Sequence, residues 1–138
     1  MERILSLDVG NKRIGVAVSD ALGLTAQGVT VISRRSLEQD LRVICDLVAK
    51  YQAAQVVIGL PLNMNGSFGP QALATQEFAH SLQSTCSVEI AFQDERLTTA
   101  AAQRTLLSGD ASRQKRKQVV DMLAAQMILD TFMARRKI

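Results

Sequence analysis

Short runs of apolar residues along the chain predict five β-strands. The runs are rich in valine, isoleucine and leucine and are bounded by glycine, proline or polar residues, as strands usually are. The first three runs are joined by short connections, which favours an antiparallel meander. The predicted strands cover about Arg3 to Val9, Arg13 to Ser19, Gly28 to Ser33, Gln55 to Leu60 and Val88 to Phe92.

Apolar residues at helical spacing predict helices after the third strand. Ser36 is a predicted N-cap for the first helix, and Pro70 opens the second. Two more are predicted at about Thr98 to Leu107 and about Lys117 to Arg135. The order β-β-β-α-β-α-β-α-α requires parallel crossovers. We therefore expect one α/β domain over residues 1–138. Its mixed sheet has three antiparallel strands, two strands parallel to the first, and helices on both faces.

The composition is that of an ordinary folded chain. Hydrophobic residues make up 47% of the 138 positions and charged residues 21%, which excludes a disordered protein. No apolar run approaches the roughly 18 residues that cross a bilayer, and no signal-peptide layout is visible, so we expect a cytoplasmic protein without membrane contact. Cys45 and Cys86 have no metal-like spacing, and we expect them to be reduced, buried thiols.

Basic residues are concentrated toward the C-terminus. The net charge is only +3, but no Lys or Arg occurs between Tyr51 and Glu95. A basic cluster can bind phosphates by releasing condensed counterions, and it can equally be a solvated loop. The densest cluster contains Arg113, Lys115, Arg116 and Lys117.

Two acidic residues stand where a carboxylate is unusual. Asp8 lies near the end of a strand that must be central and buried, where a carboxylate requires pairing, hydrogen bonds or a metal. A simpler interpretation is that Asp8 caps the following turn. Asp121 falls on the apolar stripe of the last helix, aligned with Ala125 and Ile128. The helix dipole explains an acid in the first turn, but not its inward rotation.

The third acidic segment, Asp94-Glu95-Arg96, ends the fifth strand. It can be an ordinary salt-bridged turn, but ligand sites in α/β sheets gather beyond the carboxyl ends of parallel strands. Three carboxylates from distant segments would then face one small volume.

A divalent cation would relieve the repulsion among three such carboxylates. Oxygen-only ligands suit Mg²⁺ or Mn²⁺ rather than zinc, and the only histidine, His80, has no partner of metal-like spacing. Metal-assisted attack on a phosphodiester is the chemistry that these residues favour.

Four blocks of this sequence resemble the YqgF (RuvX-like) family, in that family's order and spacing over nearly the whole chain. The blocks are residues 7–20 (LDVGNKRIGVAVSD), 57–66 (VIGLPLNMNG), 94–99 (DERLTT), and Lys117 to Asp121 with Ala124 and Ala125.

The resemblance implies an RNase H-like fold related to Holliday-junction resolvases. It also implies a bacterial nuclease that matures the 5′ end of precursor 16S rRNA in ribosome biogenesis. By motif match, Asp8, Glu95 and Asp121 fall on the family's acidic positions, as catalytic residues and metal ligands. Related resolvases carry the second acid on the fourth strand, but here that strand ends in Gly59-Leu60-Pro61 without a carboxylate. Glu95 must therefore reach from the neighbouring strand, and Asp94 is the alternative ligand.

The leading hypothesis is a metal-dependent endonuclease in which Asp8 is shared by two ions. Its expected partners are structured precursor rRNA, junction DNA and ribosomal particles, and its expected state is a monomer or homodimer. The residues expected to contact phosphates are Lys12, Arg13, Arg96, Arg113, Lys115, Arg116 and Lys117.

Other interpretations remain open at this point. Lys12 and Arg13 can be solvated hairpin residues, and Arg96 can simply pair with Asp94. The whole protein can be a non-catalytic nucleic-acid-binding factor in ribosome assembly or transcription. The Asp8-Val9-Gly10 segment also resembles the phosphate loop of actin-like ATPases, although those proteins bind nucleotide between two such domains.

Overall fold

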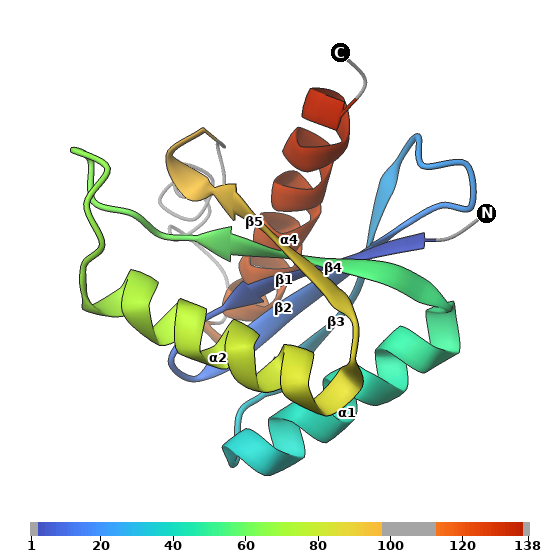
Figure 1. Ribbon diagram of the computed structural model, residues 1–138, viewed down its shortest axis with the longest axis horizontal. Coiled ribbons are helices and arrows are strands. Elements are labelled where there is room, and N and C mark those ends of the chain that lie inside the picture. Colours follow the sequence, from blue (N-terminus) through green and yellow to red (C-terminus); the bar gives the residue numbers. More distant parts are fainter. Residues whose placement is uncertain (1–2, 98–112, 137–138) are drawn as a thin grey trace.

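The computed structural model describes residues 3–97 and 113–136, in which a single mixed sheet is flanked by helices (Figure 1). The strand order is β3-β2-β1-β4-β5. Strands β1 to β3 pair antiparallel, whereas β4 and β5 run parallel to β1. The predicted mixed α/β sheet is therefore confirmed. The strands are β1 (Arg3–Val9), β2 (Arg13–Ser19), β3 (Ala26–Ser33), β4 (Ala53–Leu60) and β5 (Glu89–Asp94).

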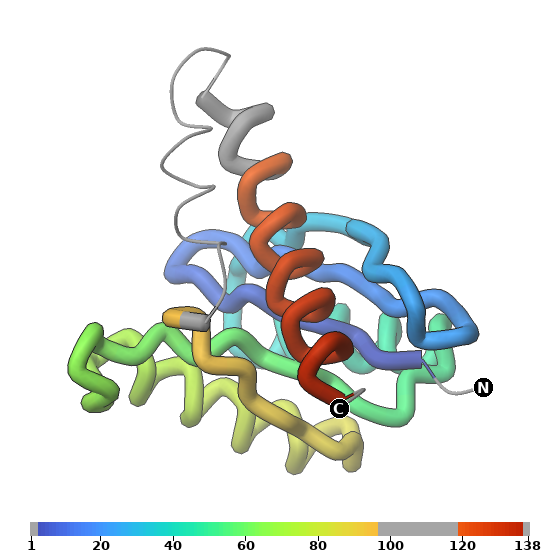
Figure 2. Tube along the Cα trace, turned by 90° about the horizontal axis from the view of Figure 1, so that it is seen from above, coloured from blue at the N-terminus to red at the C-terminus, as the bar shows by residue number. Residues whose placement is uncertain are grey.

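Helices cover both faces of this sheet. Helices α1 and α2 lie on one face, and α4 crosses the other (Figure 2). Ser36 caps α1 as predicted, since its hydroxyl accepts a hydrogen bond from the Gln39 amide. The helices are α1 (Leu37–Tyr51), α2 (Pro70–Cys86), the short 3₁₀ helix η1 (Glu95–Leu97) and α4 (Arg113–Arg136).

Several predicted boundaries are off by a few residues. Strands β3 and β4 each begin two residues early, because Ala26 and Ala53 still have pairing partners on β2 and β1. Helix α4 begins at Arg113 rather than near Lys117, so the basic cluster belongs to its first turns and not to a loop. The helix predicted at about 98–107 lies outside the described residues.

The two faces of the sheet carry side chains of different size. Large residues point toward α1 and α2 and form the main core, whereas small residues point toward α4. Helix α4 can therefore lie close to the strands. The large residues include Leu5, Leu7, Ile14, Val16, Val56 and Ile58, and the small ones Gly15, Ala17, Ala26, Gly28, Gly59 and Ala91.

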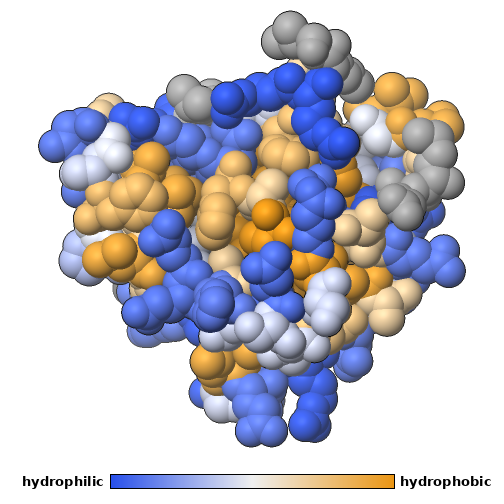
Figure 3. Space-filling model, in the orientation of Figure 1, coloured by the Kyte–Doolittle hydropathy of each residue, from blue (hydrophilic) through white to orange (hydrophobic). Residues whose placement is uncertain are grey.

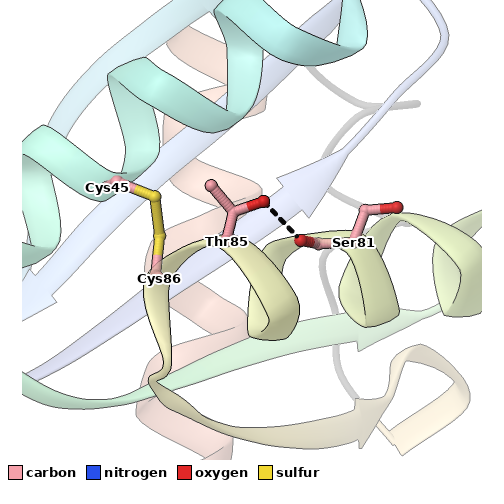
Figure 4. Close-up of a disulfide and its surroundings, with 4 residues drawn as sticks. All are labelled: Cys45, Ser81, Thr85 and Cys86. Carbon is pink, nitrogen blue, oxygen red and sulfur yellow. Dashed lines mark hydrogen bonds between the residues drawn. A yellow bond between two sulfur atoms is a disulfide. The ribbon is translucent and has the colours of Figure 1, made fainter.

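A disulfide joins the two helices on the first face. Cys45 of α1 and Cys86 of α2 are bonded, with their Cα atoms 5.6 Å apart (Figure 4). Beside them, the Thr85 hydroxyl donates to the Ser81 carbonyl in the preceding turn of α2. The prediction of two reduced thiols is therefore wrong for this structure. The two cysteines are 41 residues apart in sequence, and only the side-by-side packing of α1 and α2 brings them together.

Strand β5 is an open edge of the sheet. On the face that it forms with α2, apolar side chains reach the surface between hydrophilic ones (Figure 3). Phe92 is 40% exposed there and lines a shallow pocket beside His80. Among the described helices, none is both long and apolar enough to span a membrane.

Candidate active site

Asp8 lies on the face of the sheet that α4 covers. Strand alternation places it on the same side as Ser6, whose hydroxyl donates a 2.7 Å hydrogen bond to the Ala125 carbonyl of α4. Moving two residues along β1 from Ser6 leads to Asp8, and moving one turn back along α4 from Ala125 leads to Asp121. These two steps cover nearly the same length, about 6 Å. The packing therefore brings Asp8 and Asp121 to the same end of the helix–sheet interface.

Gly15 makes this close approach of α4 possible. It is the cross-strand partner of Asp8, and a Cβ atom there would collide with the Asp121 carbonyl. The α4 backbone thus rests directly on β2 beside Asp8, which is itself only 8% exposed. Any side chain at position 15 would push Asp121 away from the strand.

The Asp121 carboxylate is held by Arg13, the first residue of β2. The Arg13 Nε donates to Asp121 Oδ2 at 2.6 Å, and both side chains are partly exposed to solvent. Arg13 was expected to contact phosphate. In this structure it supplies the positive charge next to Asp121, a role that the sequence did not reveal.

Glu95 approaches the same place from the other side. It follows β5 in η1, and its carboxylate lies over Gly59 of β4. A Cβ atom at Gly59 would lie 2.8 Å from Glu95 Oε1 and 3.1 Å from its Cγ. Ile58 of β4 pairs with Leu7 of β1. The residues that follow them, Gly59 and Asp8, are therefore neighbours on the two adjacent strands. Glu95 therefore reaches the end of β4 next to Asp8, on the α4 face, and the missing side chain at Gly59 leaves room for it.

Asp94 is directed elsewhere. It is bound by Arg96, whose Nη2 donates to Asp94 Oδ2 at 2.7 Å and whose amide donates to Oδ1. This hydrogen bond from the Arg96 side chain holds the pKa of the Asp94 carboxyl below its usual range. Of the two neighbouring acids, Glu95 is the one whose carboxylate lies over Gly59.

A buried amide also belongs to this face. Gln93 is 1% exposed and is the β5 partner of Gly59, so it lies on the α4 side next to the Glu95 segment. Sequence reasoning did not single out Gln93 or Gly15, and it noted Gly59 only as part of a strand end without a carboxylate. The only signal for them was that small or polar residues alternate with large apolar ones along β2, β4 and β5.

The donor chemistry suits a hard divalent cation, but the site is not a ready-made metal cage. Three carboxylates supply only oxygen atoms, which Mg²⁺ and Mn²⁺ prefer. Within residues 3–97 and 113–136, however, no group of three or more His, Cys, Asp or Glu side chains is close enough to hold an ion. Because Asp121 is paired with Arg13, a cation ligated by Asp121 would compete with that guanidinium for the carboxylate.

The remaining predicted phosphate contacts lie in three different segments. Lys12 is exposed in the turn between β1 and β2. Arg96 is paired with Asp94, which is the alternative to a phosphate contact that the sequence left open. Arg96 also donates a hydrogen bond to the Met64 carbonyl. The residues of the basic cluster, Arg113, Lys115, Arg116 and Lys117, lie in the first turns of α4.

Solved structures of low sequence identity share this fold. The Thermus thermophilus RuvC in complex with a Holliday-junction substrate matches with a TM-score of 0.60 and 13% identity, covering 99% of this chain and 97% of RuvC. The fowlpox virus resolvase in complex with junction DNA matches with a TM-score of 0.54 and 10% identity, covering 97% and 98%. The RNase H-like fold expected from the resemblance is confirmed.

Curated relatives are much closer in sequence. A protein from Moorella thermoacetica named "Putative pre-16S rRNA nuclease" is 53% identical over 96% of this chain and 95% of its own length. A protein of the same name from Myxococcus xanthus is 51% identical, covering 92% of this chain and 84% of the relative. The family model described as "RuvX: Holliday junction resolvase" matches residues 2–135. The chain therefore belongs to the RuvX family, the family that its four sequence blocks resemble.

Proposed function

We propose that this protein is a metal-dependent endonuclease that processes the 5′ end of precursor 16S rRNA in the bacterial cytoplasm. The observation that supports this most directly is the placement of three acids around the end of β1. Asp8 projects from the strand itself, Asp121 is brought in over Gly15, and Glu95 is brought in over Gly59. The names of relatives at about 50% identity supply the substrate class.

Each acid has a distinct role in this proposal. Asp8 is the central ligand, shared between two Mg²⁺ or Mn²⁺ ions, and Glu95 and Asp121 each hold one ion from either side. Bound cations would activate a water molecule and stabilise the leaving oxygen of the phosphodiester. Lys12 and the first turns of α4 would hold the RNA backbone by phosphate contacts.

Junction DNA is a second candidate substrate, because the matching family model carries the description of a Holliday junction resolvase. Such a junction has two symmetric cleavage sites, so a resolvase would act as a two-fold dimer. A monomer that cuts RNA and leaves a four-way junction intact would exclude this alternative.

The test uses the full chain with end-labelled RNA that spans the 5′ end of mature 16S rRNA, and in parallel a four-way DNA junction. We expect Mn²⁺-dependent cleavage of the RNA, loss of cleavage in EDTA, and a severe defect in Glu95→Gln. Asp94→Asn is the matched control, since its carboxylate binds Arg96, and it should retain most activity. Salt-sensitive RNA binding without cleavage under any metal would instead indicate a non-catalytic binding protein.

A further inference from the structure

The loop between β4 and α2, residues 61–69, is held in one shape by its own hydrogen bonds. The Asn63 amide donates to the Ser67 carbonyl, and the Gly66 amide donates back to the Asn63 carbonyl. The Asn65 side chain accepts hydrogen bonds from the Ser67 amide and hydroxyl. Gly66 adopts a φ of 85°, which favours glycine, and completes the turn. The tip of this loop is thus an ordered turn that its own hydrogen bonds stabilise.

This turn displays an apolar side chain to solvent. Met64 is 89% exposed, the highest value among the large hydrophobic side chains of the described residues. Its neighbours Asn63, Asn65 and Ser67 are polar and uncharged, and they bond to one another rather than shielding it. Exposing an apolar side chain at the tip of an ordered turn contributes nothing to folding. The side chain is therefore available to contact a bound molecule.

The loop is attached to the candidate active site. Arg96 donates from Nη1 to the Met64 carbonyl at 3.1 Å, and its guanidinium lies against Gly66. Arg96 directly follows Glu95 and is fixed by Asp94. The loop itself begins two residues after Gly59, over which the Glu95 carboxylate lies. In Figure 1 it projects beyond the carboxyl end of β4, on the side where η1 follows β5.

We propose that Met64 is a wedge that contacts an unstacked base of the RNA beside the cleaved phosphate, so that the enzyme selects unpaired or branched positions over regular duplex. This inference rests on the proposed function. Methionine and other apolar side chains are known to insert between base steps, where the base faces replace water. A fixed loop at the edge of the site would place such a side chain reproducibly next to the three acids.

The size of the apolar surface favours a base over a protein partner. A stable protein interface buries about 800 Å² on each side. Here the exposed large apolar side chains of the loop are Met64 and, at 44% exposure, Phe68, and Met64 stands between two asparagines. Such a surface matches a single nucleobase, whose flat apolar face has polar edges that neighbouring asparagines can meet.

The experiment compares Met64→Ala with Leu22→Ala, both made in an Asp8→Asn background so that the RNA stays intact. Leu22 is 65% exposed in the hairpin between β2 and β3, at the opposite end of the sheet, and provides a matched loss of exposed apolar surface. The probes are an RNA duplex with one unpaired 2-aminopurine next to the processing position and the same duplex fully paired. Affinity is measured by fluorescence anisotropy, and unstacking by 2-aminopurine emission.

We expect Met64→Ala to bind the unpaired probe about tenfold more weakly, at the lower end of base-stacking effects, and to bind the paired probe normally. The change in 2-aminopurine emission on binding should be lost, and Met64→Phe should restore it. Leu22→Ala should behave as the parent. The inference would be overturned if Met64→Ala bound the unpaired probe as tightly as the parent, or if it lost the same affinity for both probes. A change of oligomeric state in Met64→Ala would also overturn it. If the parent binds neither RNA, the proposed function itself fails.

Discussion

The two faces of the sheet are built for different purposes. The face under α1 and α2 is lined by large, fully buried aliphatic side chains and joined by a disulfide. The face under α4 carries several glycines and alanines beside Val57 and Ile4, and Asp8, Asp121 and Glu95 lie at its carboxyl end. Large side chains maximise buried apolar area and hence stability. Small ones let a helix backbone and a carboxylate approach the strands, and so one face stabilises the fold while the other shapes the site.

The largest expected effect comes from removing the central acid of the α4 face. We expect Asp8→Asn to reduce Mn²⁺-dependent RNA cleavage by at least about a thousandfold, since the metal ions would lose their shared ligand. The midpoint of thermal unfolding should stay the same or rise, because a buried charge near two other acids is removed. Cleavage rates and calorimetry on the same preparation check both parts. Full activity would remove Asp8 from catalysis.

A substitution on the other face should do the opposite. Ile44 of α1 is fully buried in the main core, so Ile44→Ala should lower the free energy of unfolding by about 2–5 kcal/mol. The cleavage rate per folded molecule should be preserved, because α1 packs on the face away from the three acids. Chemical denaturation and single-turnover cleavage at low temperature separate these quantities. A large loss of activity without loss of stability would contradict the division between the faces.

Gly59 tests whether the empty space on the α4 face serves Glu95. In Gly59→Ala, the new Cβ must displace the ends of the Glu95 and Ile128 side chains, which are flexible enough to move. We expect cleavage to fall roughly 10- to 100-fold, within the range for a misplaced catalytic group, with little change in stability.

Gly28→Ala is the matched control for this prediction. It adds the same methyl group on the same face, but against the flexible side chain of Met122 rather than against an acid. Activity should therefore be near normal. Equal defects in the two variants would mean that α4 packing, and not the position of Glu95, limits the reaction.

The smallest effect is expected at Arg13. Removing its guanidinium in Arg13→Ala should cost no more than about 1 kcal/mol of stability, as is typical of partly exposed ion pairs. Mn²⁺ should bind a few-fold more tightly by calorimetry, because the Asp121 carboxylate no longer has a competing cation. Arg42→Ala removes an exposed pair with Glu38 and should change neither quantity. Weaker Mn²⁺ binding in Arg13→Ala would show that Arg13 assists the cation.

The features that the sequence predicted are those with local periodicity. Strands β1 and β2 have the predicted bounds, and Ser36 caps α1 as expected. The helical angle between Asp121 and Ala125 correctly placed Asp121 on the face of α4 that packs against the sheet. Each of these follows from spacing within a few residues.

The features that were missed depend on contacts between distant segments. Arg13 and Asp121 are 108 residues apart, and their pairing follows from how α4 crosses β2. The Cys45–Cys86 disulfide depends on the packing of two helices against each other. The sequence predicted that Glu95 must reach from the neighbouring strand, but not that the missing side chain of Gly59 provides the room for it. No local pattern encodes any of these three contacts.

The most direct measurement is the anomalous scattering of a crystal of this protein soaked in Mn²⁺. We predict a manganese peak at the carboxyl end of β1, with oxygen atoms of Asp8, Glu95 and Asp121 at about 2.0–2.2 Å and with the Arg13 guanidinium moved away from Asp121. A saturated soak without manganese beside Asp8, and with Arg13 still bound to Asp121, would contradict the central claim that these acids share a cation site.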